Sequence, residues 1–93
     1  MAKKLKFSKS FKDCYIKLPD SIQKKLDKQL WLLQTDAAHP SLNLHRIKGT
    51  SGIWEGYVDK FYRFTFEITE EYYYLRLVGP HNIIDMEDRR KKL

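Results

Sequence analysis

The spacing of the apolar residues changes near His39-Pro40-Ser41, and this change constrains the fold more than any other feature of the sequence. Before it, apolar residues recur at the three- and four-residue intervals of helices; after it, they alternate with polar residues as in strands. A chain of 93 residues has room for one domain, which we expect to span residues 1–93. Helices followed by strands predict an α+β fold, in which an N-terminal helical hairpin packs on one face of a small antiparallel β-sheet.

Two amphipathic helices are expected in the N-terminal part of the chain. The apolar stripe of the first helix is Phe11, Cys14, Tyr15 and Leu18. Ser8 or Ser10 is suited to cap this helix, and Pro19 ends it. Asp20 and Gln23 have the spacing of a capping box, which marks the start of a second helix. The apolar stripe of that helix is Ile22, Leu26, Leu30 and Leu33.

Short strands account for most of the remaining chain. Leu5 and Phe7 alternate with lysines, which suits an edge strand ahead of the first helix. After the loop, four strands are expected: Leu42 to Leu44 with an extension to Ile47 left open, Ile53 to Val58, Phe61 to Ile68 and Tyr72 to Val78. Gly79-Pro80 should stop the last of them, because proline cannot donate to a ladder. With both helices on one face, the other face of the sheet would be free for function.

The chain is basic, with 18 Lys and Arg against 12 Asp and Glu and a formal net charge of +6. Such an excess favours an anionic partner, and a nucleic acid, an anionic membrane surface and an acidic protein all fit it, as does solubility alone. Cys14 is the only cysteine, so no internal disulfide can form. The first residues contain no apolar run long enough for a signal peptide or a membrane span. These features favour the cytoplasm and predict no membrane association.

Arg63 is the first candidate for a functional residue. In the strand from Phe61 to Ile68 the aromatic side chains share one face, which we expect to be the core. Arg63 would then stand in the middle of the strand on the open face. A guanidinium there can hold a phosphate with two parallel hydrogen bonds, or can form an ordinary cross-strand ion pair.

The register of the hairpin decides what lies beside Arg63. A two-residue turn at Asp59-Lys60 would bury Glu55 opposite Phe64, whereas a loop one residue longer pairs Glu55 with Arg63 on the exposed face. We expect the second register. It suits a catalytic base beside a phosphate clamp, and it suits a plain salt bridge equally well.

His81 is the second candidate, on the loop Gly79-Pro80-His81-Asn82 that follows the last strand. Histidine is the side chain best matched to proton transfer near neutral pH, although a single loop histidine often has no such role. Arg46 and Lys48 form a basic cluster that could follow a phosphodiester backbone or simply keep the loop soluble. The three histidines are scattered without the spacing of metal ligands, so no metal is expected.

Four stretches of the chain together resemble the RelE/ParE superfamily of toxins from type II toxin–antitoxin modules: His39 to Gly49, Gly52 to Glu55, Tyr62 to Phe64 and Gly79 to Asn82. With the order of helices and strands, the likeness covers nearly the whole chain. It implies a single RelE-like domain, with the fold of microbial ribonucleases, and a cognate antitoxin that wraps and neutralises it. In the RelE, YoeB and HigB branches it implies metal-independent cleavage of mRNA in the ribosomal A site, without a cofactor.

The resemblance also assigns roles to particular residues. Arg63 matches the strand arginine that holds the scissile phosphate, and His81 matches a C-terminal acid or base histidine. Arg46, Lys48 and Asn82 fall among the residues that would contact RNA. Glu55 stands where RelE has a lysine and Tyr57 replaces a second one, so the RelE set of catalytic lysines is absent, and Glu55 is assigned as the base from geometry alone.

The leading hypothesis is therefore an endoribonuclease toxin that cleaves ribosome-bound mRNA and so arrests translation. Arg63 would stabilise the phosphorane, His81 would protonate the leaving oxygen and Glu55 would be the base. The alternatives are a ParE-like inhibitor of DNA gyrase and a degenerate toxin that only binds its antitoxin.

Overall fold

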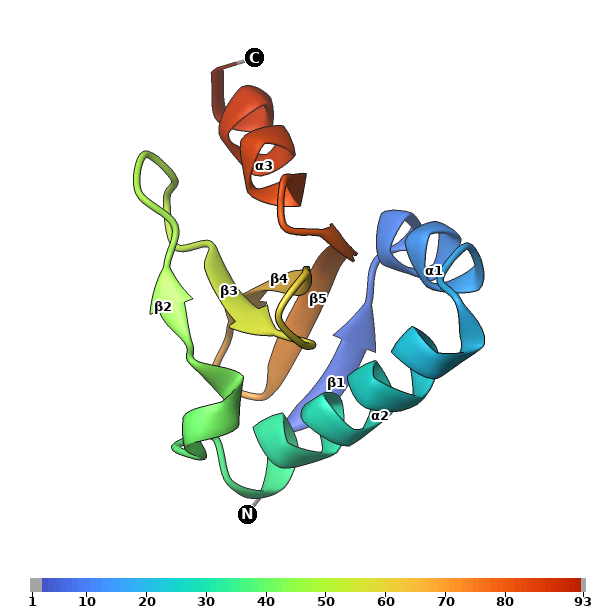
Figure 1. The fold of residues 1–93 in the computed structure, drawn as a ribbon. Coiled ribbons are helices and arrows are strands. Elements are labelled where there is room, and N and C mark those ends of the chain that lie inside the picture. Colours follow the sequence, from blue (N-terminus) through green and yellow to red (C-terminus); the bar gives the residue numbers. More distant parts are fainter. Residues whose placement is uncertain (1–2, 93) are drawn as a thin grey trace.

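The chain folds into a five-stranded sheet with two helices on one face and a third helix on the other (Figure 1). The computed structural model describes the backbone of residues 3–92 and the side chains of residues 3–87. The elements in chain order are β1 (Lys4–Phe7), α1 (Lys9–Ile16), α2 (Asp20–Thr35), the short 3-10 helix η1 (Pro40–Leu42), β2 (His45–Arg46), β3 (Trp54–Tyr57), β4 (Tyr62–Ile68), β5 (Tyr72–Pro80) and α3 (Ile83–Lys92). The predicted α+β class is confirmed. No helix in the described part of the chain is both long and apolar enough to cross a membrane.

The N-terminal helices form as the apolar spacing predicts. The predicted cap at Ser8 is confirmed, and the predicted cap of the second helix is not. The Ser8 hydroxyl accepts a hydrogen bond from the N–H of Phe11 at 2.9 Å and caps α1. The predicted capping box at the start of α2 is wrong: Pro19 occupies the cap position and no side chain caps the helix. Gln23 instead donates to the main-chain oxygen of Tyr15 at 2.8 Å, so its amide joins the two helices.

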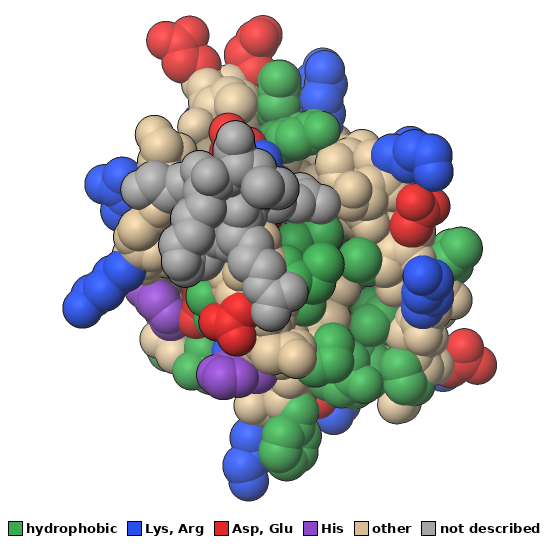
Figure 2. Space-filling view, turned by 90° about the horizontal axis from the view of Figure 1, so that it is seen from above, with side chains coloured by type: hydrophobic (Ala, Val, Ile, Leu, Met, Phe, Trp, Pro, Cys, Tyr) green, Lys and Arg blue, Asp and Glu red, His purple; other side chains and the backbone are tan. Residues whose placement is uncertain are grey.

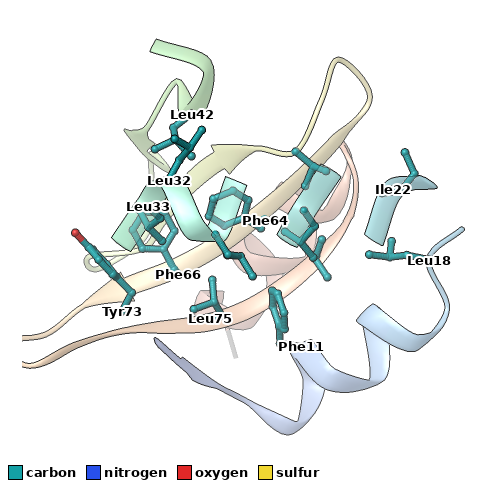
Figure 3. Packing of buried hydrophobic residues seen from close by; sticks show 14 residues of the cluster. Phe11, Leu18, Ile22, Leu32, Leu33, Leu42, Phe64, Phe66, Tyr73 and Leu75 are labelled. Carbon is teal, nitrogen blue, oxygen red and sulfur yellow. The ribbon is translucent and has the colours of Figure 1, made fainter. Parts of the chain in front are cut away.

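The core lies between α1, α2 and the sheet, as Figure 3 shows. The aromatic face of β4 supplies its centre, since Phe64 and Phe66 are completely buried and their rings stack at 5.6 Å. Leu26 and Leu33 of α2 meet them with no more than 1% of their surface exposed. Burying a large apolar side chain stabilises a fold by roughly 1.5–3 kcal/mol, so this contact is a substantial part of the core.

The sheet has the strand order β1-β5-β4-β3-β2, antiparallel except for the pair β1 and β5. The predicted edge strand β1 is confirmed. The last strand runs two residues further than expected, to Pro80, which pairs with Tyr62 and ends the strand there. Leu42 is not in a strand: Pro40 starts η1, and the left-handed Asn43, with φ of 44°, ends it.

The expected register of the β3–β4 hairpin is wrong by two residues. Glu55 is opposite Thr65, and Arg63 is opposite Tyr57. The reason is Asp59, whose Oδ1 accepts the N–H groups of Phe61 at 2.8 Å and Tyr62 at 2.9 Å and so closes a three-residue loop. A shift of two residues keeps every side chain on its predicted face but separates Glu55 from Arg63 along the strands.

The face opposite α1 and α2 is partly covered rather than free. Helix α3 folds back over β4 and β5, and its Ile83 and Glu87 are 5% and 2% exposed. Four buried apolar residues lie outside the main core: Ile47, Ile53, Leu77 and Ile83. Leu77 is opposite Thr65, on the face away from Phe64 and Phe66. The functional face therefore consists of what α3 leaves accessible.

Gly56 is required because the main chain of β3 packs directly against two large side chains. A Cβ at this position would lie 2.5 Å from Cζ of Phe64 and 2.9 Å from Cδ2 of Leu44. We expect Gly56→Ala to lower the free energy of unfolding by about 1–3 kcal/mol, the usual cost of overpacking a core. Urea unfolding would measure it, with Gly52→Ala as the comparison: a Cβ there meets no atom within 4 Å, and any loss comes from its positive φ of 85°. A Gly56→Ala protein as stable as the parent would contradict this packing.

Candidate active site

Strand pairing arranges the side chains on the face beneath α3 in rows. His45, Glu55 and Thr65 are directly opposite one another across β2, β3 and β4. Two residues further along β3, Tyr57 is opposite Arg63. The two rows are about 6.6–6.8 Å apart, because a strand rises about 3.3–3.4 Å per residue. A carboxylate row thus lies beside a guanidinium row.

His81 extends this arrangement by one more row. Its N–H donates to the main-chain oxygen of Phe61 at 2.9 Å, which continues the pairing of β4 and β5 beyond Pro80. The His81 side chain is exposed. Glu55 and His81 consequently lie in the rows on either side of Arg63. The end of the molecule that carries α3, seen in Figure 2, presents histidine side chains next to carboxylates.

Glu55 is bound to a histidine to which the sequence analysis gave no role. The Glu55 carboxylate is 4% exposed, and its Oε1 lies 2.5 Å from Nε2 of the half-exposed His45. Nδ1 of the same ring lies 3.0 Å from the main-chain oxygen of Asn43. Both ring nitrogens of His45 therefore face oxygen acceptors, one from a side chain and one from the main chain. Only the pairing of β2 with β3 brings the two residues together, and the predicted strand reaches His45 only if it extends beyond Leu44 towards Ile47.

The second oxygen of Glu55 has no hydrogen-bond partner. Among the described side chains, Oε2 is the one fully buried nitrogen or oxygen atom without one. An unpaired buried carboxylate oxygen destabilises the fold by several kcal/mol in an apolar setting, so native structures keep such an atom where chemistry requires it. Among the described side chains, Oε2 is thus an acceptor whose hydrogen-bonding capacity is not used.

Arg63 is buried, in contrast to its expected place on an open face. It is 6% exposed, and its Nη1 donates to the main-chain oxygens of the hairpin loop: Asp59 at 2.7 Å, Lys60 at 3.1 Å and Tyr62 at 3.1 Å. Its Cζ lies 3.5 Å from the centre of the Tyr57 ring. Within the described part of the chain, Nε and Nη2 make no hydrogen bond. Arg63 thus holds the loop with one nitrogen and keeps two others for a ligand.

Asp59 completes the loop as an ionised group. Burial acts to raise the pKa of its carboxyl, but the N–H groups of Phe61 and Tyr62 and the ammonium of Lys25 together lower that pKa. The Lys25 contact is 3.3 Å. Ionised Asp59 therefore keeps the loop beside Arg63 and His81 closed at neutral pH.

A second ionic network fixes α3 on the sheet. Glu87 accepts hydrogen bonds from Thr65 at 2.7 Å and from Nε of Arg76 at 2.9 Å, and Arg76 also binds Glu67. Hydrogen bonding to Glu87 is the main reason why the pKa of the Arg76 guanidinium is raised. Because Thr65 is opposite Glu55, this network places the start of α3 next to the carboxylate row.

The three residues expected to contact RNA occupy different positions. Arg46 is opposite Trp54, so it faces the core side of the sheet at the outer edge of β2, not the side of Glu55 and Arg63. Lys48 is exposed in the turn that follows β2. Asn82 is exposed next to His81, and its main-chain oxygen accepts the N–H of Asp85 at 3.1 Å in the first turn of α3. Asn82 and His81 are thus neighbours at the site, whereas Arg46 lies on the opposite face of the sheet.

Known structures share this fold at low sequence identity. YafQ from E. coli strain BL21(DE3) superimposes with a TM-score of 0.72 at 15% identity, over 88% of this chain and 97% of YafQ. The RelE–RelB complex from Pyrococcus horikoshii OT3 gives 0.70 at 13% identity, over 86% of this chain and 96% of the matched chain. The YoeB dimer from Staphylococcus aureus gives 0.72 at 13% identity, over 87% and 99%.

Sequence comparison adds nothing to these likenesses: no family model matches the chain, and no curated protein does. At such identities the likeness concerns the path of the backbone and not the side chains of the site. The coverage is nearly complete on both sides, so the whole fold is shared and not one motif. The resemblance found in the sequence is confirmed at this level: the chain has the fold of the RelE/ParE superfamily of toxins.

Proposed function

We propose that the protein is the toxin of a type II toxin–antitoxin module and acts as an endoribonuclease on mRNA at the ribosome. The observation that carries the proposal is the order of groups on one face of the sheet: an unpaired carboxylate oxygen of Glu55, the guanidinium of Arg63 and the exposed imidazole of His81. An acceptor, a fixed cation and a group able to donate a proton are the parts that cleavage of a phosphodiester by its own 2′-hydroxyl requires.

The proposed reaction uses these groups in sequence. Glu55 takes the proton of the 2′-hydroxyl, whose oxygen attacks the adjacent phosphorus. Nε and Nη2 of Arg63 stabilise the negative charge that grows on the phosphoryl oxygens. The bond from phosphorus to the 5′-oxygen breaks as His81 gives that oxygen a proton, which leaves a 2′,3′-cyclic phosphate and a 5′-hydroxyl. Acid and base lie in rows on opposite sides of the arginine, as in-line displacement requires.

Burial of Glu55 sets a condition on this mechanism. Oε2 has no contact with solvent, so a ribose can reach it only if a neighbouring side chain moves aside. His45 has half of its side chain in solvent and belongs to the two-residue edge strand β2, so it has the space to do so. The 2′-hydroxyl of the substrate would then replace His45 as the hydrogen-bond partner of Glu55.

An antitoxin is the proposed protein partner. One of the similar structures is the E. coli DinJ–YafQ toxin–antitoxin complex, in which the matched chain has 16% identity and a TM-score of 0.72. Co-expression with the product of an adjacent small reading frame, followed by co-purification, would test the partnership. Growth arrest on expression of this chain alone, and its relief by the neighbouring protein, is the expected result.

Mapping of RNA ends after induction tests the activity. We expect new 5′-hydroxyl ends within coding regions, formed equally with a chelator present in the purified reaction, because side chains supply every group. Intact mRNA together with DNA damage would instead support a gyrase inhibitor. Absence of both, with antitoxin binding retained, would leave a degenerate toxin.

The basic residues of β2 and of the turn after it should contribute to RNA binding through charge. In the double variant Arg46→Gln, Lys48→Gln, the slope of log K against log salt for a single-stranded RNA should decrease by up to about 1.4, since each phosphate contact contributes about 0.7. The matched control is Lys24→Gln, Lys28→Gln, which removes the same charge from exposed positions of α2. Equal slopes for the two double variants would exclude phosphate contacts at Arg46 and Lys48.

A further inference from the structure

Phe61 is an apolar ring that the fold leaves in solvent. It is 66% exposed, although the neighbouring aromatic residues of β4, Phe64 and Phe66, are completely buried. The exposed large apolar side chains elsewhere in the described chain are Phe7, Ile16, Trp31, Ile68 and Met86. Phe7 and Ile16 line an apolar hollow of about 320 Å³ between α1 and α2, where nothing in the structure indicates what would cover it. Phe61 is separate from this hollow and lies beside the candidate active site.

The loop that carries Phe61 is held by hydrogen bonds on every side. Oδ1 of Asp59 accepts the N–H of Phe61 at 2.8 Å, and the N–H of His81 donates to the Phe61 oxygen at 2.9 Å. Nη1 of Arg63 binds the oxygens of the two preceding residues. The main chain on both sides of the ring is thus fixed while the ring is free. A ligand that stacks on it encounters an ordered surface and loses little affinity to the ordering of the loop.

The surroundings of the ring are cationic rather than apolar. The ammonium of Lys60 lies 5.7 Å from the ring centre. The one carboxylate of the loop, Asp59, is engaged by two N–H groups and by Lys25. A protein interface would be expected to surround an exposed aromatic anchor with further apolar surface. A single ring among cations, next to groups suited to a phosphodiester, favours single-stranded nucleic acid.

We propose that Phe61 is a stacking platform for one unpaired base of the RNA, the base adjoining the scissile phosphate on the side of His81. This inference rests on the proposed function, since it takes the phosphate to lie between Glu55 and His81. The row geometry supports it: the main chain of Phe61 is hydrogen-bonded to that of His81, and Phe61 stands directly before β4, two residues ahead of Arg63. Because every base offers a π-face, the platform would position the strand with little preference for sequence.

The test uses an RNA in which the nucleotide that would supply the attacking 2′-hydroxyl is a deoxynucleotide, so that the RNA binds without being cut. The adjoining base is 2-aminopurine. Binding to the parent protein should quench the fluorescence of the 2-aminopurine. In Phe61→Leu, which keeps an apolar side chain but removes the π-face, quenching should disappear and affinity should fall about 5- to 150-fold. Phe61→Trp should retain both. Trp31→Leu, which removes an equally exposed ring from α2, is the matched control and should change neither.

Other results of this experiment would contradict the stacking inference, the proposed function or both. If the parent protein cleaves RNA but Phe61→Leu binds and quenches as the parent does, the stacking inference fails and the proposed function stands. If Phe61→Leu keeps RNA binding and loses antitoxin binding, the ring belongs to a protein interface. If the parent protein neither binds nor cleaves RNA, both proposals fail. Unchanged urea midpoints for the variants, expected for an exposed ring, exclude unfolding as the cause.

Discussion

A Glu55→Gln variant should cleave RNA about 10²- to 10⁴-fold more slowly than the parent protein, the range that a positioned general base contributes. Glutamine has the size of glutamate and can still meet His45, but its amide cannot take a proton from the 2′-hydroxyl. Single-turnover cleavage at saturating protein would separate this loss from any loss of affinity. The pH–rate profile should also lose the limb that comes from ionisation of the base.

Glu70→Gln is the matched control for this variant, because it removes one carboxylate from an exposed position in the β4–β5 turn. It should cleave as the parent does. If Glu55→Gln retains the full rate and the full pH profile, the carboxylate is not the base. Its unpaired oxygen would then require a different explanation, such as a bound water.

Glu87→Ala should be the most damaging change for stability, lowering the free energy of unfolding by about 3–5 kcal/mol. The substitution leaves Arg76 part-buried without its main partner and removes the acceptor of the Thr65 hydroxyl. Replacing both ionic partners by apolar residues, as in Arg76→Met with Glu87→Leu, should recover most of the loss. Urea unfolding of the single and double variants gives the coupling between them.

The control for Glu87→Ala is Asp85→Asn, which removes one exposed charge from the same helix and should cost no more than about 1 kcal/mol. The raised pKa of Arg76 stabilises the fold at every pH below the unfolded value and is lost only as the pH rises through the folded value, which is strongly alkaline. The part of the loss in unfolding free energy that comes from the raised pKa of Arg76 should therefore not vary between pH 6 and pH 9. A cost as small as that of Asp85→Asn would mean that α3 is not fixed by this network.

The fold could be predicted from the sequence where burial alone decides it. The stripe from Ile22 to Leu33 and the alternation of Phe64 and Phe66 each leave one side of an element apolar, and the structure buries both. What escaped prediction depends on single polar side chains. Asp59 sets the hairpin register by accepting two N–H groups, and no apolar pattern distinguishes the two registers that place the same residues inside.

The shared face of the proposed site residues could be predicted from the sequence, but their arrangement on that face could not. Glu55, Arg63 and His81 do share one face, as alternation requires, yet the first two are buried, and the basic sequence of α3 gave no sign that this helix would fold over β4 and β5. His45 was overlooked because its partner is ten residues away, across a strand pair of only two residues. Contacts of this kind depend on tertiary pairing and have no local signal.

The pairing of β1 with β5 has a consequence for when the sheet can close during synthesis. Lys4 is aligned with Tyr72, so the first strand of the described chain obtains its partner only after nearly all the rest has been synthesised. Contacts this distant in sequence form slowly, and during translation they must wait for the C-terminal strand to leave the ribosome. His81 and α3 follow that strand and are assembled later still. A chain interrupted before β5 therefore lacks both the strand that joins β1 to β4 and the candidate site residue His81.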